Sequence, residues 1–391
     1  MGAESLYKVQ GDFKVKKIEL IIIIAVACII SFVYYGPFLD NYFVWDDFWM
    51  LENFYTRSFK EFLFGFADLR VFGNCILWLN CLVSGFNPIG YSLISISTHI
   101  ANSAMLFLLI YSLSGNRLLS GFIAIIFVAS AVGSDAIFWI DAFLTLTDLF
   151  FYLLTLYLYV EGNKRGNKIY HNLALIVFVL AMFNKESIAS MPFMIIFIEM
   201  LFFRDGERLT LKLKRVLPYF LVIIVYIGLS SVISRYYVHQ EQFERFLTFR
   251  PFHTLFSGFT SFFISPKGRL RWENPLLYIV ALFILFSFPM IKDRKLFFFG
   301  LGWAFISFLP QSLTGSTIFD GPYLLNSISR HLYLPSVAPA IVFSVILLSI
   351  KERFSQKVFV VATALFFTVF ISLNYEKVNA RGRQWKEQGI I

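Results

Sequence analysis

Long hydrophobic segments recur along the whole chain of 391 residues, and they constrain the fold more than any other feature. A helix needs about 20 apolar residues to cross the ~30 Å hydrocarbon core of a bilayer. Eleven segments can be marked, several of them shorter than that length: 18–35, 88–111, 118–134, 142–160, 169–183, 187–203, 216–233, 275–291, 296–310, 335–350 and 358–373. Inside lipid the backbone satisfies its hydrogen bonds only in helices or closed barrels. The pattern predicts an all-α polytopic membrane protein, with about eleven transmembrane helices in one domain over 1–391.

Composition and charge support this prediction. The chain is 58% hydrophobic and 15% charged, whereas soluble domains are nearer half apolar and a quarter charged. The net charge of +9 does not indicate a nucleic-acid partner, because the basic residues gather in alternate short loops. If the first segment is a retained signal anchor, these loops face the cytoplasm. Their basic residues are Lys8, Lys14, Lys16, Lys17, Arg117, Lys164, Arg165, Lys168, Arg204, Arg208, Lys212, Lys214, Arg215, Lys292, Arg294, Lys295, Lys351, Arg353 and Lys357.

The opposite, outer side carries the long connections. These are the first outer loop 36–87, further outer loops 234–274 and 311–334, and a short outer tail 374–391. The first loop contains two helix patterns. Ser58 and Glu61 have the spacing of a capping box ahead of an apolar run, and 68–82 presents Trp78 on an apolar face. Both patterns are typical of helices that lie in the membrane interface.

Two adjacent carboxylates, Asp46 and Asp47, lie in the outer motif FVWDDFW. Burial and mutual repulsion both oppose the ionisation of such a pair, so water, a substrate or a cation must relieve the cost. The alternative is an ordinary acidic helix start or surface pair. The position of the pair Asp46–Asp47, just outside the first membrane segment, predicts a functional site at the outer surface.

Further acids lie on the same predicted side. Asp135 and Asp141 bracket the turn GSDAIFWID, and Asp148 follows about two turns into the next segment. Acids within membrane segments are functional candidates by default. Asp148 has an alternative interpretation as a packing residue that is hydrogen-bonded to Thr145 or Thr147.

Basic residues accompany these acids. Lys185 lies in the outer turn FNKES, and Arg330 and His331 begin the motif SRHLYLPS. Arg330 and Arg70 are suited to bidentate binding of a phosphate, or they are anchors at the membrane interface. Lys185 has the alternative of pairing with its neighbour Glu186.

These motifs together resemble the GT-C membrane glycosyltransferases, nearest to the protein O-mannosyltransferase-like branch that includes the transmembrane-and-tetratricopeptide-repeat enzymes. The resemblance covers nearly the whole chain, and each motif is weak alone. It rests on the order and spacing of FVWDD, SGFNPIGYSLISISTHIAN with His99, GSDAIFWI, FNKESIASMPF, SRHLYLPS and NARGRQWKE. His99 lies within a membrane segment, where a packed, hydrogen-bonded histidine is expected.

The resemblance implies an inverting glycosyltransferase that moves a sugar from a polyprenyl-phosphate donor to a hydroxyl of a protein, glycan or lipid. The enzyme would lie in a bacterial or archaeal cytoplasmic membrane, surrounded by membrane lipids, with its site on the outer face. The resemblance implies that Asp46 and Asp47 are catalytic and that Asp135 and Asp148 form a second acidic site. The residues implied for the donor phosphate are Arg330, Lys185, Arg70 and His331. A divalent cation such as Mg²⁺ or Mn²⁺, if one binds, is implied at Asp46 and Asp135.

The chain also departs from the family pattern. Val71 follows Arg70 where relatives often have proline, Ser92 stands where histidine is frequent, and Ala131 and Val132 replace a usual His-Pro. No tetratricopeptide repeat follows. Two alternatives therefore stay open, which are a transporter or flippase for a lipid or solute, and a non-catalytic membrane subunit with the same fold.

Overall fold

The computed structural model describes residues 17–44, 46–64, 69–203, 209–233, 282, 284–313 and 330–389, and within these ranges the regular structure is helical, without strands. The expected outer loop 234–274 lies outside the described residues, as do 275–281 of the eighth hydrophobic segment and 314–329 of the third outer loop. Each other expected hydrophobic segment overlaps a helix.

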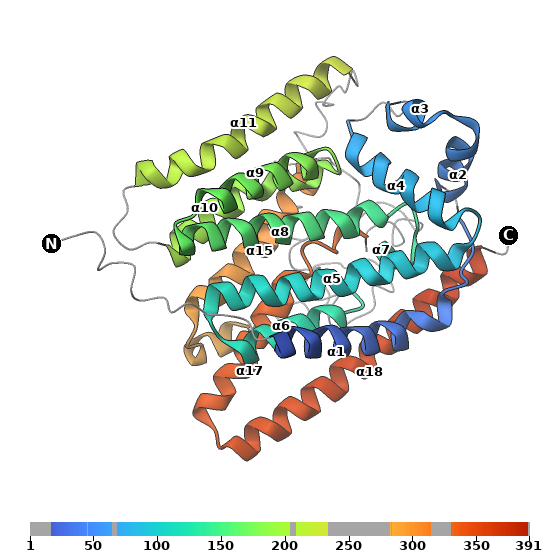
Figure 1. The fold of residues 1–391 in the computed structure, drawn as a ribbon. Helices are drawn as coiled ribbons and strands as arrows, with labels where there is room; N and C mark the ends of the chain where they lie inside the picture. The colour runs from blue at the N-terminus through green and yellow to red at the C-terminus, as the bar shows by residue number, and fades with distance from the viewer. Residues whose placement is uncertain are drawn as a thin grey trace.

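The helices follow one another along the chain (Figure 1). They are α1 (Lys17–Tyr35), η2 (Gly36–Phe38), α2 (Asp46–Thr56), α3 (Phe59–Phe64), α4 (Val71–Ser84), α5 (Pro88–Ser114), α6 (Arg117–Val128), α7 (Asp135–Phe138), α8 (Phe143–Arg165), α9 (Lys168–Met182), η3 (Glu186–Ser190), α10 (Met191–Phe202), α11 (Leu209–Ile233), η4 (Phe288–Met290), α15 (Arg294–Leu313), α17 (Val337–Arg353) and α18 (Gln356–Gln388).

Five helices of the described part are long and apolar enough to cross a membrane, namely Lys17–Phe38, Pro88–Ser114, Phe143–Arg165, Thr210–Val232 and Gln356–Gln388. Four shorter apolar helices accompany them, Val71–Ser84, Arg117–Val128, Lys168–Met182 and Val337–Lys351. Long helices α11 and α18 expose large apolar side chains, including Ile224 and Val361. Contiguous apolar surface of this kind needs lipid or another protein to cover it. The fold is therefore that of an all-helical membrane protein.

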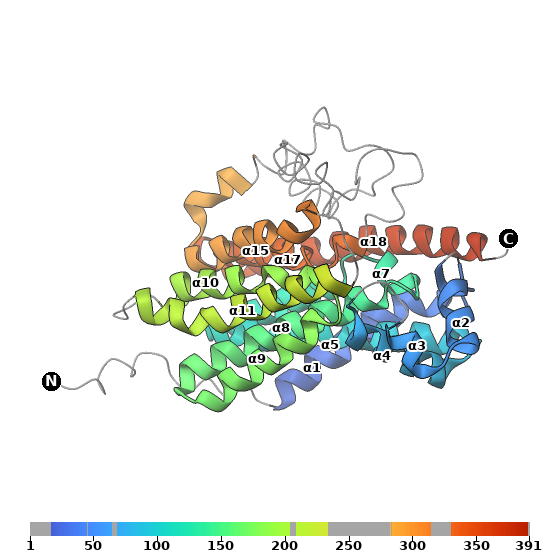
Figure 2. The same ribbon diagram turned by 90° about the horizontal axis from the view of Figure 1, so that it is seen from above.

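The helices pack in layers around α5 and α8. These two helices contact each other through the middle of the molecule, with α1, α6, α17 and α18 on one side and α9, α10 and α11 on the other (Figures 1 and 2). The start of α5 is set by Asn87, whose side chain accepts a hydrogen bond from the backbone N–H of Ile89, with Pro88 in the first turn. Proline is tolerated there because the first N–H groups of a helix have no intrahelical partner.

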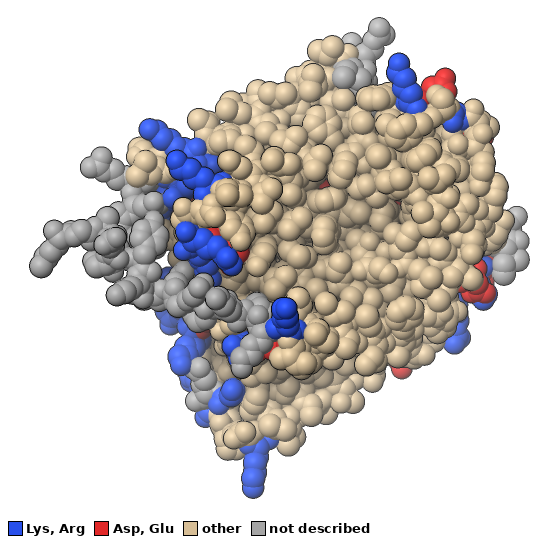
Figure 3. Space-filling model, viewed as in Figure 1, with Lys and Arg blue, Asp and Glu red and all other residues tan. Residues whose placement is uncertain are grey.

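Charge divides the two ends of the molecule. Lysine and arginine side chains gather at the end where α8 ends and α9 begins, while α2, α3 and α4 lie at the opposite end (Figures 1 and 3). This separation agrees with the alternation of basic and non-basic loops in the sequence.

The expected helices of the first outer loop are present. The capping box at the start of α3 is confirmed, because Glu61 Oε2 accepts from Ser58 N at 2.9 Å and Glu61 N donates to Ser58 Oγ at 3.3 Å. The second helix, expected over 68–82, is α4, which begins at Val71; residue 68 is not described. Its Trp78 packs against Phe54 and Phe59, with ring centroids 5.8 and 4.6 Å apart.

The polar tail differs from the expectation of a short separate segment after 373. Helix α18 continues without a break through Asn374 to Gln388. Asn374 is buried, where its side-chain Nδ2 donates to Phe370 O at 2.8 Å and its Oδ1 accepts from Ala131 N at 2.8 Å. The hydropathy change at this point marks a change of surroundings and not the end of the helix, since α18 there passes the turn between α6 and α7.

Candidate functional site

The acidic pair begins helix α2, and its two members have different surroundings. Asp47 is 1% exposed, whereas Asp46 is exposed. Asp47 Oδ2 accepts a hydrogen bond from Val44 N at 3.1 Å, and its Oδ1 accepts one from Asp141 N at 2.8 Å. Burial raises the pKa of Asp47 to about 8, although both backbone hydrogen bonds oppose the rise. Asp47 therefore fixes the backbone, and Asp46 is the acid open to a ligand.

Asp141 is the second acid of the site. It lies in the turn between α7 and α8, where burial raises the pKa of its carboxyl group, Arg330 opposes the rise and Asp46 adds to it. The two carboxylates of Asp46 and Asp141 thus act on each other across the structure. The sequence pattern predicted Asp135 and Asp148 as the second acidic site and did not include Asp141, although Asp141 brackets the same turn as Asp135.

Asp135 is held by the other end of the chain. Its Oδ1 accepts from Arg381 Nε at 2.5 Å and from Trp385 Nε1 at 2.8 Å, and the residue is 1% exposed. One carboxylate oxygen is therefore occupied by α18. Among the described residues no group of three His, Cys, Asp or Glu side chains has the arrangement of a metal site, so the divalent cation on Asp46 and Asp135 remains an untested prediction.

Asp148 lies in the second turn of α8 and is buried. Its Oδ2 accepts a hydrogen bond from the hydroxyl of Ser187 in η3. The expected alternative partners bind elsewhere, since Thr147 donates to Leu144 O at 3.1 Å and Thr145 accepts from Lys185. Asp148 therefore joins α8 to the turn that carries Lys185.

Lys185 lies in the turn between α9 and η3, and Arg70, just before α4, lies beside that turn. Arg70 binds Glu186 through two contacts, Nε to Oε2 at 3.0 Å and Nη2 to Oε1 at 2.5 Å. Lys185 Nζ donates to Thr145 Oγ1 at 2.7 Å. The proposed pairing of Lys185 with Glu186 is thus replaced by these two contacts. Burial lowers the pKa of Lys185, and the positive charges of Arg70 and Arg330 lower it further.

Arg330 and His331 lie just before α17. The Arg330 Cζ atom is 4.0 Å from the centre of the Trp139 ring, a close cation–π contact. Burial lowers the pKa of Arg330, while Asp141 and Asp46 oppose that effect. Burial, with the nearby Lys185 and Arg330, lowers the pKa of His331 to about 3, so this imidazole is neutral and contributes no positive charge near pH 7. Arg330 Nε and His331 Nδ1 are buried without a hydrogen-bond partner among the described residues.

A buried network holds the turn that carries Arg330. His99 Nε2 lies 3.3 Å from Val128 O, and because a carbonyl can only accept, Nε2 carries the proton. His99 Nδ1 then accepts from the hydroxyl of Tyr333 at 2.7 Å, and that hydroxyl accepts from Asn102 Nδ2 at 3.1 Å. The expectation of a packed, hydrogen-bonded His99 is confirmed. Its position next to Tyr333 was not visible in the sequence.

The structure therefore brings together most of the charged residues that the sequence singled out. We call Asp46, Asp141, Arg70, Lys185 and Arg330 the charged cluster, because each interacts electrostatically with at least two of the others. Asp46, an exposed carboxylate that interacts with the Arg330 guanidinium, can accept a proton, while the cations of the cluster stabilise an anion.

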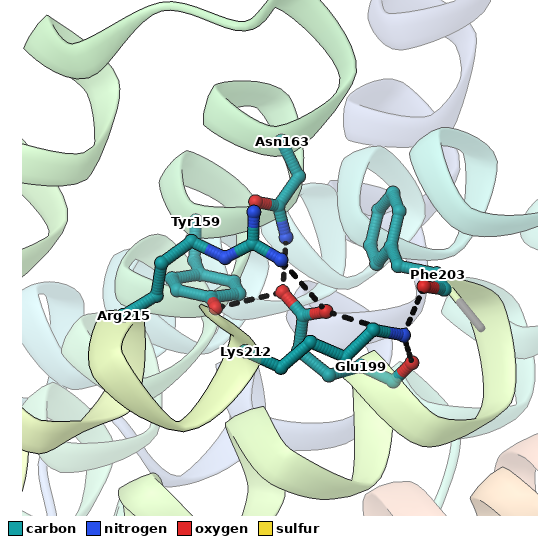
Figure 4. Close-up of polar contacts among 6 residues, drawn as sticks. All are labelled: Tyr159, Asn163, Glu199, Phe203, Lys212 and Arg215. Carbon is teal, nitrogen blue, oxygen red and sulfur yellow. Dashed lines mark hydrogen bonds and ion pairs between the residues drawn. The ribbon is translucent and has the colours of Figure 1, made fainter. Parts of the chain in front are cut away.

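A second polar group, at the end where α8 ends, has a different character (Figure 4). The buried Glu199 of α10 accepts hydrogen bonds from Tyr159 at 2.8 Å and Asn163 at 2.7 Å, and lies 3.3 Å from Arg215 Nη2. Lys212 donates to the backbone oxygens of Glu199 and Phe203. These contacts join α8, α10 and α11, so the group stabilises the packing of these three helices.

No protein-family model matches the chain, and a search of curated proteins finds no similar sequence. The class established by the fold is an all-helical membrane protein that carries a charged cluster where several of its helices begin.

Proposed function

We propose that this protein is a multi-pass GT-C-like inverting glycosyltransferase with about eleven transmembrane helices. It transfers a sugar from a polyprenyl-phosphate donor to an acceptor hydroxyl at the outer face of the membrane. The observation that carries the proposal is the exposed carboxylate of Asp46, which interacts electrostatically with Asp141 and the guanidinium of Arg330.

The acceptor oxygen must lose a proton as it attacks the anomeric carbon of the sugar. A positioned carboxylate contributes roughly 10²–10⁴-fold to such a step. Asp46 is suited to the role because it is exposed at the first turn of α2. Asp47 is less suited, because both of its oxygens accept backbone hydrogen bonds. Its role is to hold α2 against the turn before α8.

The departing lipid phosphate gains negative charge as the bond to the sugar breaks. Arg330, Lys185 and Arg70 would stabilise that charge, since preorganised cations act most strongly in surroundings from which water is excluded. The buried Nε of Arg330 has no partner among the described residues, which supports its availability for a phosphate oxygen. His331 would contribute a neutral hydrogen bond and not a charge.

The outer location is supported by charge. The Lys- and Arg-rich end (Figure 3) would face the cytoplasm by the positive-inside rule. Helix α2, which begins at Asp46, lies at the opposite end (Figure 1). A transporter is the main rival, and its coupling charges are typically near the membrane midplane. Asp46 begins α2, Asp141 precedes α8 and Arg330 precedes α17. Positions at helix ends favour the transferase.

The test uses the full chain in proteoliposomes with radiolabelled polyprenyl-phosphate mannose or polyprenyl-phosphate glucose, and it measures sugar release or transfer. We expect turnover of one donor by the parent protein and a loss of at least about 100-fold in Asp46→Asn. Glu52→Gln is the matched control, because Glu52 is exposed on the same helix. No turnover of either donor by the parent, or equal rates in the parent and Asp46→Asn, contradicts the proposal.

A further inference from the structure

The last turns of α18 contact the site through Asp135. Arg381 and Trp385 are four residues apart, so their side chains lie on one face of the helix. Both donate to Oδ1 of Asp135, a residue about 250 positions earlier in the chain. A buried carboxylate that loses one charged partner keeps its desolvation penalty. The contact therefore holds α18 against the turn between α6 and α8.

The contact continues from Trp385 to the charged cluster. The rings of Trp385 and Trp139 are 5.8 Å apart at 38°, and both belong to a small apolar group, separate from the main core, with Val44 and Ala142. The Trp139 ring also contacts Arg330, whose Cζ lies 4.0 Å from the ring centre. Asp135, Trp385, Trp139 and Arg330 thus form one continuous series of contacts.

The same part of α18 also holds the segment that leads to the acidic pair. Asn41 Nδ2 donates to Gly382 O at 3.3 Å. A Cβ on Gly382 would lie 2.6 Å from the ring of Phe38, so only glycine allows this approach. Lys386 adds an exposed ion pair with Asp40, 3.0 Å long, of the kind that contributes little stability.

We propose that Arg381 and Trp385 are positioning residues for the guanidinium of Arg330. Asp135 fixes the end of α18 through both of them, and the Trp385 ring then holds the Trp139 ring, against which Arg330 lies. The position of Arg330 then depends on a helix at the far end of the chain. The consequence for donor use rests on the proposed function. The placement of Arg330 does not, and it can be tested without activity.

The test is chemical modification of the full-length protein in detergent with p-hydroxyphenylglyoxal, which reacts with arginine, followed by peptide mass spectrometry. Trp385→Ala and Trp139→Ala each remove part of the series, and we expect Arg330 to react faster by on the order of threefold or more. Trp385→Phe keeps a ring against Trp139 but lacks the N–H donor, so we expect an intermediate rate. Lys386→Ala, one residue along, is the matched control and leaves the rate unchanged.

General loosening of the protein is distinguished by an internal reference. Arg215 binds Glu199 at the opposite end of the molecule, so partial unfolding raises the reactivity of both arginines. A change in Arg330 alone supports the proposal. An unchanged Arg330 rate in Trp385→Ala and Trp385→Phe overturns it, as does an equal rise at Arg215.

Donor kinetics separate the two proposals. If the parent turns over the radiolabelled donor, Trp385→Phe should raise the donor KM several-fold more than it lowers kcat, and Arg381→Lys should recover part of the loss seen in Arg381→Ala. If the parent is inactive while Arg330 reactivity changes as expected, the proposed function fails and the positioning series stands. If the parent is active and Arg330 reactivity is unchanged, the positioning series fails and the proposed function stands.

Discussion

The carboxylate of Asp47 accepts a hydrogen bond from the backbone amide of Asp141, with Oδ1 and N 2.8 Å apart. This bond joins residues 94 positions apart in the chain. It fixes the start of α2, and with it Asp46, against the turn that precedes α8. The relative position of Asp46 and Asp141 depends on it, so several predictions concern this region.

The first prediction separates the two members of the acidic pair. Asp46→Asn should abolish transfer with little change in thermal stability, because Asp46 is exposed. Asp47→Asn should be less severe, since its amide oxygen still accepts a backbone hydrogen bond, whereas Asp47→Ala should cost about 1–3 kcal/mol of stability by leaving a buried N–H unpaired. Transfer rates and melting temperatures of the three purified variants give the answer. Near-normal turnover by Asp46→Asn would exclude it as the base.

The second prediction concerns pH. Burial raises the pKa of Asp47 to about 8, from 3.8 in the unfolded chain. Between these values the folded protein binds more protons than the unfolded chain, so the contribution of Asp47 to stability is greatest at low pH. It falls as the pH rises from about 4 to 8, by at most about 1.4 kcal/mol per pH unit.

Melting temperatures of the parent and Asp47→Asn from pH 5 to 9 test this dependence. Asp47→Asn cannot ionise at this position. The melting temperature of the parent should therefore fall relative to that of Asp47→Asn up to about pH 8, and above pH 8 the two curves should be parallel. Parallel curves throughout would show that Asp47 does not titrate in this range.

The third prediction concerns Arg330 and the lipid phosphate. Arg330→Ala should weaken donor use by more than tenfold, because a charge-assisted hydrogen bond contributes about 1.5–3 kcal/mol. Arg330→Lys should recover only part, since an ammonium group lacks the planar fork of guanidinium. The measurement is the donor concentration dependence of the rate. Arg383→Ala, an exposed arginine on α18, is the control, and full rescue by lysine would identify Arg330 as an interface anchor.

The fourth prediction concerns topology. In a background without Cys28, Cys75 and Cys81, Asp320→Cys should react with an impermeant thiol reagent applied from outside intact cells. Asp293→Cys, in the basic connection before α15, should react only after permeabilisation. Asp320 lies outside the described residues, so this prediction rests on the positive-inside pattern. The opposite labelling would place the charged cluster on the cytoplasmic side.

The fifth prediction concerns the polar group around Glu199. Glu199→Gln leaves Lys212 and Arg215 beside a neutral amide, and removal of one charge from a buried pair costs about 3 kcal/mol or more. We expect a lower melting temperature with unchanged donor affinity, because the group lies far from the charged cluster. Arg165→Ala, which removes the half-exposed partner of Glu161, should have little effect. A change in donor affinity without loss of stability would assign this group a role in function.

Local patterns in the sequence predicted many of the helices and the set of charged candidates. The hydrophobic segments, the basic connections and the capping box of Ser58 and Glu61 depend on neighbouring residues, and the described part of the chain has helices in these segments. Most of the eighth segment lies outside that part, and α2 was not predicted. The end of α18 was not predicted from hydropathy, because hydropathy falls after Asn374 while the helix continues to Gln388.

The sequence by itself determined an all-helical membrane protein, with acidic and basic candidates on one predicted side. Only the tertiary structure decided the surroundings of each candidate. Asp46 is exposed, Asp47 is bonded to backbone amides, and Asp135 is held by Arg381 and Trp385. The physical reason is that the ionisation and availability of a carboxylate depend on its burial and its nearest donors. Val44 is a local donor to Asp47, but Asp141, Arg381 and Trp385 lie 94 to 250 positions away from the acids to which they donate.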